Sequence, residues 1–436
     1  MSGQDVVVVR YSPGERRAVL VFSLLGTALD GADFAIFILF LAPLAAYFHL
    51  SILAVDAVQA GSYVAGIAGA WLFGVLAGRA GRRWGLAATM ALYSLASLAA
   101  AFSPDYTVLF ALRLIGGVGL GGELGIALSS LNEAWPSQRR GVLSALLQGM
   151  FLVGSALATV LFAVCSARFG PAGWRWGLGL LGSGALVAAV VRRWMPESRV
   201  WTASRGGSEQ RAVLGSILRQ PRWRGLTVRL LGLLTAISFT AYAVETFLPT
   251  AWITVYRLPL GTVDTLVFLG LAVIFVAYLL FGRLSDARGR RTAAFDAAVF
   301  GAVGFAAFAL LLGVGWDRGS LPGRLPLGTT AVFLWMLAAA APYAVQGAWL
   351  SELFPTDIRA AAVNFVYYVG RAVGGGLAPL GALALAQALG GDVRLAMELG
   401  LLGTVAVALL VRGLPETRGQ PLPLRSEDLR PVVVEG

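Results

Sequence analysis

Apolar segments separated by short polar ones run along nearly the whole chain. Most of them extend for about 20 residues or more, long enough for a helix to cross the hydrocarbon core of a bilayer. The pattern predicts an all-α, polytopic membrane protein with twelve transmembrane helices. The predicted spans are residues 18–48, 56–80, 84–103, 106–134, 140–167, 173–195, 224–256, 262–284, 291–316, 327–353, 358–389 and 393–412.

A polar stretch in the middle of the chain divides these spans into two sets of six. We predict an N-terminal six-helix bundle at 1–195, a cytoplasmic linker at 196–223, a C-terminal six-helix bundle at 224–412 and a cytoplasmic tail at 413–436. In the linker, apolar residues recur at helical spacing from Arg211 to Arg219. This fits either a short helix at the membrane interface or a solvated connection.

The two ends of the chain are polar. The tail is rich in proline and charge, which is typical of disorder. At the other end, the Val6–Val9 run is too short for the apolar region of a signal peptide. The first span is therefore expected to be a retained helix.

Charged residues are few and unevenly placed. They make up 13% of the chain, whereas a soluble domain carries roughly 25%, so most of the chain does not face water. All 34 basic residues are arginine, and they gather in alternate loops. By the positive-inside rule this places both termini and the linker in the cytoplasm, with the protein in the inner membrane. We read the net charge of +11 as a topology signal and expect no nucleic-acid partner.

The two halves of the chain repeat the same motifs. The segment Glu133 to Arg140 returns as Glu352 to Arg359, about 219 residues later. Pro196-Glu197-Ser198-Arg199 returns as Pro415-Glu416-Thr417-Arg418 at the same offset, and residues 74–83 are echoed by residues 282–291. Internal symmetry of this kind in a membrane chain indicates a transporter built from two related bundles, with the substrate between them.

The cysteine and histidine counts exclude several other classes. With one cysteine, Cys165, and one histidine, His49, the chain has no disulfide framework, no zinc spacing and no Cys–His nucleophile pair. We expect no metal, no cofactor and no enzyme activity. A transporter-derived sensor would need an output domain, and the predicted termini are too short for one.

Elements rich in glycine and arginine occupy corresponding loops of the two halves. Glycines let helices cross closely, and an aspartate can accept hydrogen bonds at a helix N-terminus or pair with arginine. The second-half element matches the signature G-x-x-x-D-x-x-G-R-[KR] of the major facilitator superfamily, which this chain resembles; the first half has Gly78 where the second has Asp286. Because glycine cannot make the charged contact, the first-half lock is expected to be weaker.

The resemblance implies a gate at the cytoplasmic side. Its expected members are Gly74, Gly78, Arg79, Gly81, Arg82, Gly282, Asp286, Gly289 and Arg290, together with the structural pairs Glu133–Arg140 and Glu352–Arg359.

A second arginine lies within the fourth span. Arg113 begins an R-x-x-x-G-x-G-x-G element that also resembles the superfamily, and an arginine at membrane depth is costly unless it is paired or hydrated. Asp30 and Asp33 in the first span lie at i and i+3, on one helical face, and are its expected partners. We assign proton coupling to Asp30, Asp33 and Arg113, and interpret Glu123 as a packing or gate residue.

Further motifs narrow the resemblance. The Asp30-Gly31-Ala32-Asp33 pair, Gly173-Trp174-Arg175-Trp176 and Phe247-Leu248-Pro249-Thr250 are similar to the branches that carry aromatic acids, nicotinate and sialate with protons. The resemblance covers nearly the whole chain. It implies a small organic anion and a proton as partners, in a lipid bilayer, with the monomer as the functional unit.

Arg371 is a candidate to bind an organic anion by its chemistry alone. It lies about 13 residues, or roughly 20 Å, into the eleventh span and offers a planar fork suited to a carboxylate. The alternative is a structural pair with an acid such as Glu245. The other polar groups at membrane depth that could complete a pocket are Tyr242, Glu245, Gln346, Asn364, Tyr367 and Tyr343.

These residues predict a proton-coupled symporter of a small organic carboxylate that works by alternating access. A proton on Asp33 would release Arg113 and let the bundles rock, with substrate held near Arg371. The alternative is a neutral-sugar porter, favoured by the Pro-Glu-Ser and Pro-Glu-Thr-Arg-Gly motifs. A cationic-drug exporter fits less well, because it would not need a buried arginine in the eleventh span.

Overall fold

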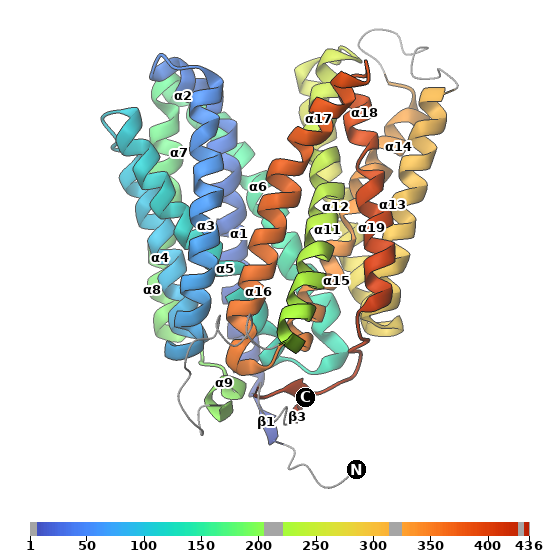
Figure 1. Cartoon of the computed structure of the whole chain (residues 1–436). Helices are drawn as coiled ribbons and strands as arrows, with labels where there is room; N and C mark the ends of the chain where they lie inside the picture. The colour runs from blue at the N-terminus through green and yellow to red at the C-terminus, as the bar shows by residue number, and fades with distance from the viewer. Residues whose placement is uncertain (1–6, 205–220, 314–324, 426–430, 436) are drawn as a thin grey trace.

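A computed structural model describes residues 7–204, 221–313, 325–425 and 431–435. It confirms the all-α architecture with two bundles of six membrane-crossing helices (Figure 1). The first bundle contains α1 (Pro13–Leu39), α3 (Ile52–Ala80), α4 (Arg82–Ala100), α5 (Tyr106–Ala134), α6 (Arg140–Phe169) and the pair α7 (Gly173–Leu181) and α8 (Gly184–Trp194).

The second bundle repeats this order. It contains α11 (Pro221–Thr254), α12 (Leu260–Arg288), α13 (Arg290–Gly313), the pair α14 (Leu327–Leu337) and α15 (Pro342–Leu353), the pair α16 (Thr356–Arg371) and α17 (Ala378–Ala388), and the pair α18 (Val393–Glu398) and α19 (Leu401–Leu410). The short helices α2 (Leu41–Tyr47) and α9 (Arg199–Ser204) lie outside the crossings. The predicted interfacial helix at Arg211 to Arg219 lies outside the described residues.

Ten described segments are long and apolar enough to cross a membrane. One of these segments, Ser137–Trp194, contains two crossings, α6 and α7–α8. Helix α4 is not among the ten segments and forms the twelfth crossing. The first helix begins earlier than predicted, at Pro13, because Ser12 and Glu15 form a capping box in which each side chain accepts a hydrogen bond from the other's backbone N–H.

Glycines allow the helices of the first bundle to touch backbone to backbone. A side chain at Gly121 would overlap the backbone of Gly66, so α5 and α3 can meet this closely only without one. Gly31, between the two aspartates of α1, lies in the same way against the backbone of Phe151 on α6. Small residues at such crossings are typical of membrane helix packing, and here they bring the α1 aspartates close to α6.

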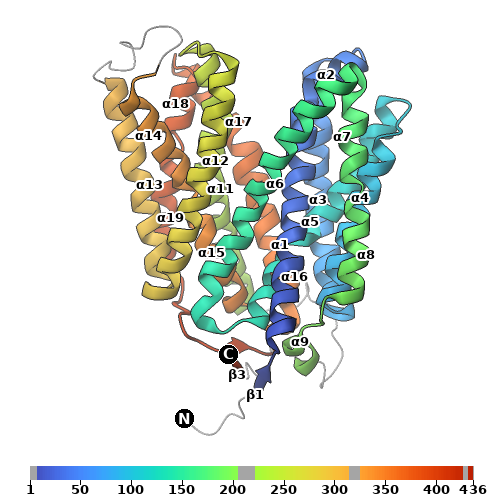
Figure 2. The same ribbon diagram turned by 180° about the vertical axis from the view of Figure 1, so that it is seen from behind.

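The two bundles lean together at the face that carries both termini and lean apart at the opposite face (Figures 1 and 2). We call these the terminal face and the open face. Helices α6 and α12 pack against each other across the midline, as do α3 and α16. Any site between the bundles therefore lies above a closed terminal face.

The prediction of a disordered tail was wrong. Strand β3 (Pro431–Glu435) pairs in parallel with β1 (Val7–Arg10) and antiparallel with β2 (Leu422–Pro423), forming a three-stranded sheet on the terminal face (Figure 1). The reason is an alternation that the proline content masks: Val432 and Val434 are buried while Val433 faces out.

The sheet is attached to both bundles. Arg16 on α1 donates to the backbone carbonyl of Glu435, and Arg199 N–H donates to the Tyr11 hydroxyl at 2.7 Å. From the second bundle, Arg359 donates to the carbonyl of Pro423 at 3.2 Å. The termini therefore hold the closed ends of the bundles together.

We expect Val432→Asp to lower the Tm of the purified protein by several degrees. Val432 is fully buried, and burying a carboxylate there without a partner costs about 2 kcal/mol or more. Val433→Asp is the matched control, because Val433 on the same strand is 39% exposed. Equal Tm values for the two variants would mean that the sheet contributes nothing to stability.

Candidate functional site

Two clusters of buried charge close the terminal face. In one, Glu133 accepts from Arg82 at 2.9 Å and from Arg359 at 2.7 Å. In the other, Glu352 accepts from Arg290 at 2.9 Å and lies 3.7 Å from Arg140. Ser198 and Thr417 donate to the two glutamates at matching positions. Each cluster draws charges from both bundles.

The expected pairing within each repeat was wrong. Glu133 pairs with Arg359 rather than Arg140, and Glu352 pairs with Arg140 rather than Arg359. Each of these arginines donates from its Nε to carbonyls at the end of the preceding helix. Arg140 bonds those of Asn132 and Trp135, and Arg359 bonds those of Ser351 and Phe354. The remaining end of each guanidinium then reaches the other bundle, so the pairs cross the midline.

Gly81 and Gly289 form matching turns between helices. Both have φ close to +106°, a conformation that favours glycine. Glu197 caps the helix after Gly81 by accepting from Arg82 N–H at 2.7 Å, and Glu416 caps the helix after Gly289 by accepting from Arg290 N–H at 2.9 Å. Burial raises the pKa of Glu416, but backbone N–H donors outweigh burial and hold it below its usual value.

The two repeats differ at the aspartate position of the signature. Asp286 accepts from the N–H groups of Gly141 and Val142 at 2.8 and 2.9 Å, and pairs with Arg290 at 2.7 Å. It therefore caps α6 of the other bundle. Gly78 has no side chain to do the same for α16. Arg79, another expected gate residue, is exposed, whereas Gly74 packs on Ala361 and Gly282 packs on Ala145.

We expect Gly78→Asp to stabilise the state that is closed at the terminal face. A Cβ at Gly78 meets only the carbonyl of Asp357, at 3.6 Å, so there is room, and an acidic cap on a helix N-terminus contributes about 1 kcal/mol. The Tm should rise by a few degrees and transport should slow. Asp286→Gly, the reciprocal change, should act in the opposite direction; a lower Tm for Gly78→Asp would contradict the expectation.

Asp33 and Arg113 form a buried ion pair inside the first bundle. The Nη1 of Arg113 donates to Asp33 Oδ2 at 2.8 Å, and both side chains are 1% exposed. Ser97 Oγ donates to the other oxygen of Asp33, and the guanidinium carbon lies 4.7 Å from the centre of the Phe37 ring. The carboxylate from α1 and the arginine from α5 thus form the pair that the sequence predicted, because an arginine at membrane depth is costly without a partner.

Asp30 has a different environment from Asp33. It is 6% exposed and accepts no hydrogen bond from the described residues, and the charges nearest to it are those of Arg371 and Asp33. Asp30 is therefore near enough to both Asp33 and Arg371 for their charges to interact. Glu123 is also fully buried, beside Gly26 and Tyr93, and neither of its carboxylate oxygens has a hydrogen-bonding partner; it takes no part in the gate clusters.

A small cavity lies at the midline, between the bundles. Its volume is about 40 Å³, room for only a few waters, so a substrate would need the walls to move apart. Residues of α6 line one side and residues of the second bundle line the other. The full lining is Gln148, Phe151, Leu152, Tyr242, Glu245, Tyr278, Tyr343, Tyr367 and Arg371.

Arg371 is the cation of this cavity. It is 6% exposed, its Nε donates to the Tyr242 hydroxyl at 2.7 Å, and its Nη2 is buried with no hydrogen-bonding partner. Phe34 and Phe151 of the first bundle flank its guanidinium at 4.9 and 4.6 Å. Among the described residues, no acid lies within ion-pair distance of it, so the alternative pairing with Glu245 is absent from this state.

The helix changes type immediately after Arg371. Residues Ala372–Leu377 form a π-helix, a rare conformation that is frequent at functional sites. Its glycines let it pack closely on α11, since a side chain at Gly374 would overlap the backbone of Thr235 and one at Gly375 would meet the Tyr242 ring.

The predicted pocket residues do not all reach the cavity. Tyr242, Glu245, Tyr343 and Tyr367 line it, but Asn364 donates to the carbonyl of Gly122 at 2.9 Å and acts as a contact between bundles. Gln346 is buried with its amide unpaired and is not part of the lining. The sequence analysis did not name four residues that line the cavity, Gln148, Phe151, Leu152 and Tyr278. The signal for Gln148 was present, because it is an amide within an otherwise apolar span.

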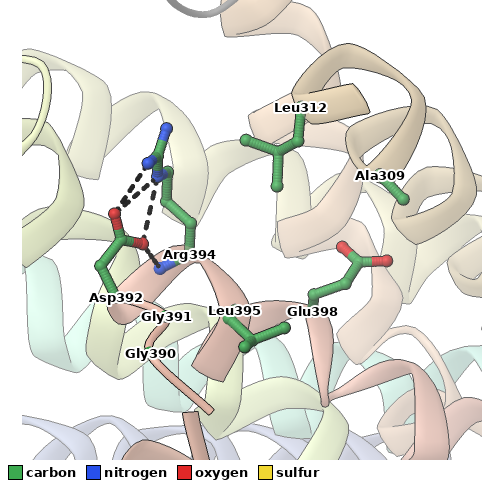
Figure 3. Close-up of a pocket in the computed structure, with 8 residues that line it drawn as sticks. All are labelled: Ala309, Leu312, Gly390, Gly391, Asp392, Arg394, Leu395 and Glu398. Atoms are coloured by element: carbon green, nitrogen blue, oxygen red, sulfur yellow. Dashed lines mark hydrogen bonds and ion pairs between the residues drawn. The ribbon is translucent and has the colours of Figure 1, made fainter. Parts of the chain in front are cut away.

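A second cavity opens near the open face of the second bundle (Figure 3). Glu398 on α18 points into it beside Leu312, while Asp392 and Arg394 pair with each other at 2.8 Å. Burial raises the pKa of Asp392, but hydrogen bonds from Arg394 outweigh burial and hold the pKa below its usual value. This cavity is lined by one bundle alone, so it is not the site between the two.

Comparisons with known proteins agree with this arrangement. The sequence profile described as Major Facilitator Superfamily matches residues 23–379. The probable 4-methylmuconolactone transporter of Cupriavidus pinatubonensis is 29% identical over 404 residues, covering 90% of this chain and 89% of that protein. The alpha-ketoglutarate permease of Escherichia coli is 26% identical, covering 73% of this chain and 74% of that protein.

A solved structure resembles the fold. The proton:xylose symporter XylE bound to 6-bromo-6-deoxy-D-glucose superposes with a TM-score of 0.73 at 20% identity, covering 94% of this chain and 98% of that chain. At this identity the similarity concerns the fold alone.

Proposed function

The chain belongs to the Major Facilitator Superfamily of membrane transporters, and we propose that it is a proton-coupled symporter of a small organic carboxylate that works by alternating access. It acts as a monomer in the inner membrane with both termini in the cytoplasm. The terminal face is then the cytoplasmic face, in accord with the alternation of arginine-rich loops. The relatives named for 4-methylmuconolactone and alpha-ketoglutarate support an organic substrate of this type.

One observation carries the choice of a carboxylate. Arg371 presents a buried Nη2 without a partner to a cavity between the bundles. A buried cation without an acid is costly, and a carboxylate that accepts from a planar guanidinium makes one of the stronger hydrogen-bonded contacts in proteins. A neutral sugar would leave that charge unpaired. The substrate therefore completes the site.

Proton coupling is assigned to the pair of Asp33 and Arg113, with Asp30 beside it. The sequence of events begins with a proton from outside that neutralises Asp33 and breaks its attraction to Arg113. The charge of Asp30 interacts with those of both Asp33 and Arg371, so a change of charge on one is felt by the other. A ligand shifts such an equilibrium only through its different affinity for the two states, and the carboxylate on Arg371 supplies that difference.

The gate clusters supply the two states. In the present state Arg359–Glu133 and Arg140–Glu352 hold the terminal face closed. Opening that face breaks both crossed pairs, while Arg82–Glu133 and Arg290–Glu352 stay intact within their own bundles. Each glutamate therefore keeps a cation throughout the cycle, which reduces the cost of opening.

Substrate-induced proton movement in proteoliposomes tests this proposal. Purified protein is reconstituted without a pH gradient, and a panel of carboxylates and sugars is added outside while external pH is recorded. We expect alkalinisation with at least one carboxylate and none with sugars. Alkalinisation with a sugar and none with any carboxylate would replace the proposal with a sugar–proton symporter, whereas carboxylate uptake without proton movement would refute the coupling alone.

A further inference from the structure

The central cavity has a second charged group besides Arg371. Glu245 lies on α11, three residues after Tyr242, so the two side chains share a face of the helix. Its Cα is about 4.5 Å farther along the helix axis, toward the open face. Tyr278 of α12 and Tyr343 of α15 are near enough to interact with its charge. Glu245 therefore faces the cavity from the side away from the gate.

Glu245 and Arg371 do not satisfy each other. Both line the cavity, yet no hydrogen bond or ion pair joins them, and Glu245 accepts no hydrogen bond from any described residue. Arg371 instead donates to the Tyr242 hydroxyl at 2.7 Å. Glu245 is half-buried, and a ligand that covered it without offering a donor would desolvate its carboxylate at a cost. The cavity thus has two charged groups of opposite sign that do not pair with each other.

Rings form the wall between these two groups. Phe151 packs against Arg371, and Tyr343 and Tyr367 have their ring centres 6.2 Å apart. Aromatic walls favour a flat, apolar body. A small, rigid ligand is enough to fill this space, since the present volume of the cavity is small.

We propose that Glu245 is a specificity-determining residue that selects ring-bearing carboxylates with a hydrogen-bond donor opposite the acid group. This inference rests on the proposed function. Arg371 holds the carboxylate of the ligand, and Glu245 accepts from a hydroxyl or amino group at its far end. An acid that lacks the donor leaves the Glu245 carboxylate desolvated and unpaired, and sites built to bind a donor strongly reject such analogues.

The test compares acids that differ only at the far end. Benzoate, 4-hydroxybenzoate, 4-aminobenzoate and 4-methoxybenzoate are titrated into the purified full-length protein by calorimetry, the methoxy compound being the larger analogue without a donor. We expect the hydroxy and amino acids to bind at least roughly tenfold more tightly than the other two. In Glu245→Gln this preference should fall to about twofold or less, and benzoate should bind more tightly than it does to the wild type, because it no longer desolvates a carboxylate.

Glu398→Gln is the matched control. Glu398 is another glutamate of the second bundle, and one of its oxygens is buried without a partner. It lies in the second cavity, near the open face, and not in the central cavity. It should leave all four affinities unchanged. Loss of benzoate-driven proton uptake in Glu245→Gln would overturn the inference, because Glu245 would then carry the proton.

The remaining outcomes separate this inference from the proposed function. Equal affinity of the wild type for all four acids, or binding only of acids without a ring, overturns the role of Glu245 and leaves carboxylate symport standing. If no carboxylate of the wider panel binds, the proposed function fails and takes this inference with it.

Discussion

Arg371→Ala should reduce carboxylate uptake by about 30-fold or more while the protein stays folded. Truncating one member of a buried charge pair costs 2–5 kcal/mol, and each 1.4 kcal/mol is a factor of ten. Among the described residues no acid forms an ion pair with Arg371, so removing it breaks no salt bridge. The measurement is initial uptake of the best acid from the panel into proteoliposomes, with Tm recorded for each variant.

Two further variants sharpen this result. Arg371→Lys keeps the charge but loses the planar fork and the bond from Nε to Tyr242, so uptake should fall by roughly tenfold. Arg394→Ala removes an arginine of the same bundle that pairs with Asp392 outside the central cavity and should transport normally. Normal uptake by Arg371→Ala would remove the carboxylate site from this cavity.

Asp33→Asn should abolish proton-driven accumulation and preserve exchange. The asparagine can still bond Ser97 and Arg113 but cannot gain or lose a proton, so a pH gradient no longer drives net uptake. Exchange of internal for external substrate needs no change at this position and should continue. Accumulation under an inward proton gradient and counterflow without one are measured on the same proteoliposomes.

This variant also has a cost in stability. Breaking a buried ion pair by neutralising one partner costs about 3–5 kcal/mol, because Arg113 keeps its charge at 1% exposure. The double variant Asp33→Asn with Arg113→Gln should regain part of the lost Tm without regaining accumulation. If Asp33→Asn still accumulates substrate with the wild-type pH dependence, the coupling residue is elsewhere, and Asp30→Asn becomes the next variant.

The sequence identified the charged residues of the two buried clusters but not their pairing. The repeated Glu133 and Glu352 motifs mark the cluster members because repeats preserve residue types at fixed spacing. Which arginine meets which glutamate depends on how two bundles face each other, and no spacing within one repeat contains that information. The crossed pairs Arg359–Glu133 and Arg140–Glu352 are therefore a property of the assembled molecule.

The central cavity was only partly predictable for a related reason. Charged residues at membrane depth are so costly that Asp33, Arg113 and Arg371 stand out in any apolar span. Phe151 and Tyr278 do not, because an aromatic residue in a membrane helix is equally suited to lipid, to packing or to a cavity. The π-helix after Arg371 left only a run of three glycines as its trace.

The terminal sheet has a consequence for biosynthesis. Strand β1 is among the first segments to leave the ribosome, whereas its partner β3 emerges only after all the membrane helices have been made. Throughout translation β1 has no partner, and Arg359 lacks the carbonyl of Pro423 that it binds in the finished protein. A nascent chain with all helices inserted therefore still lacks the sheet of its terminal face. The sheet can therefore form only after every membrane helix has been synthesised.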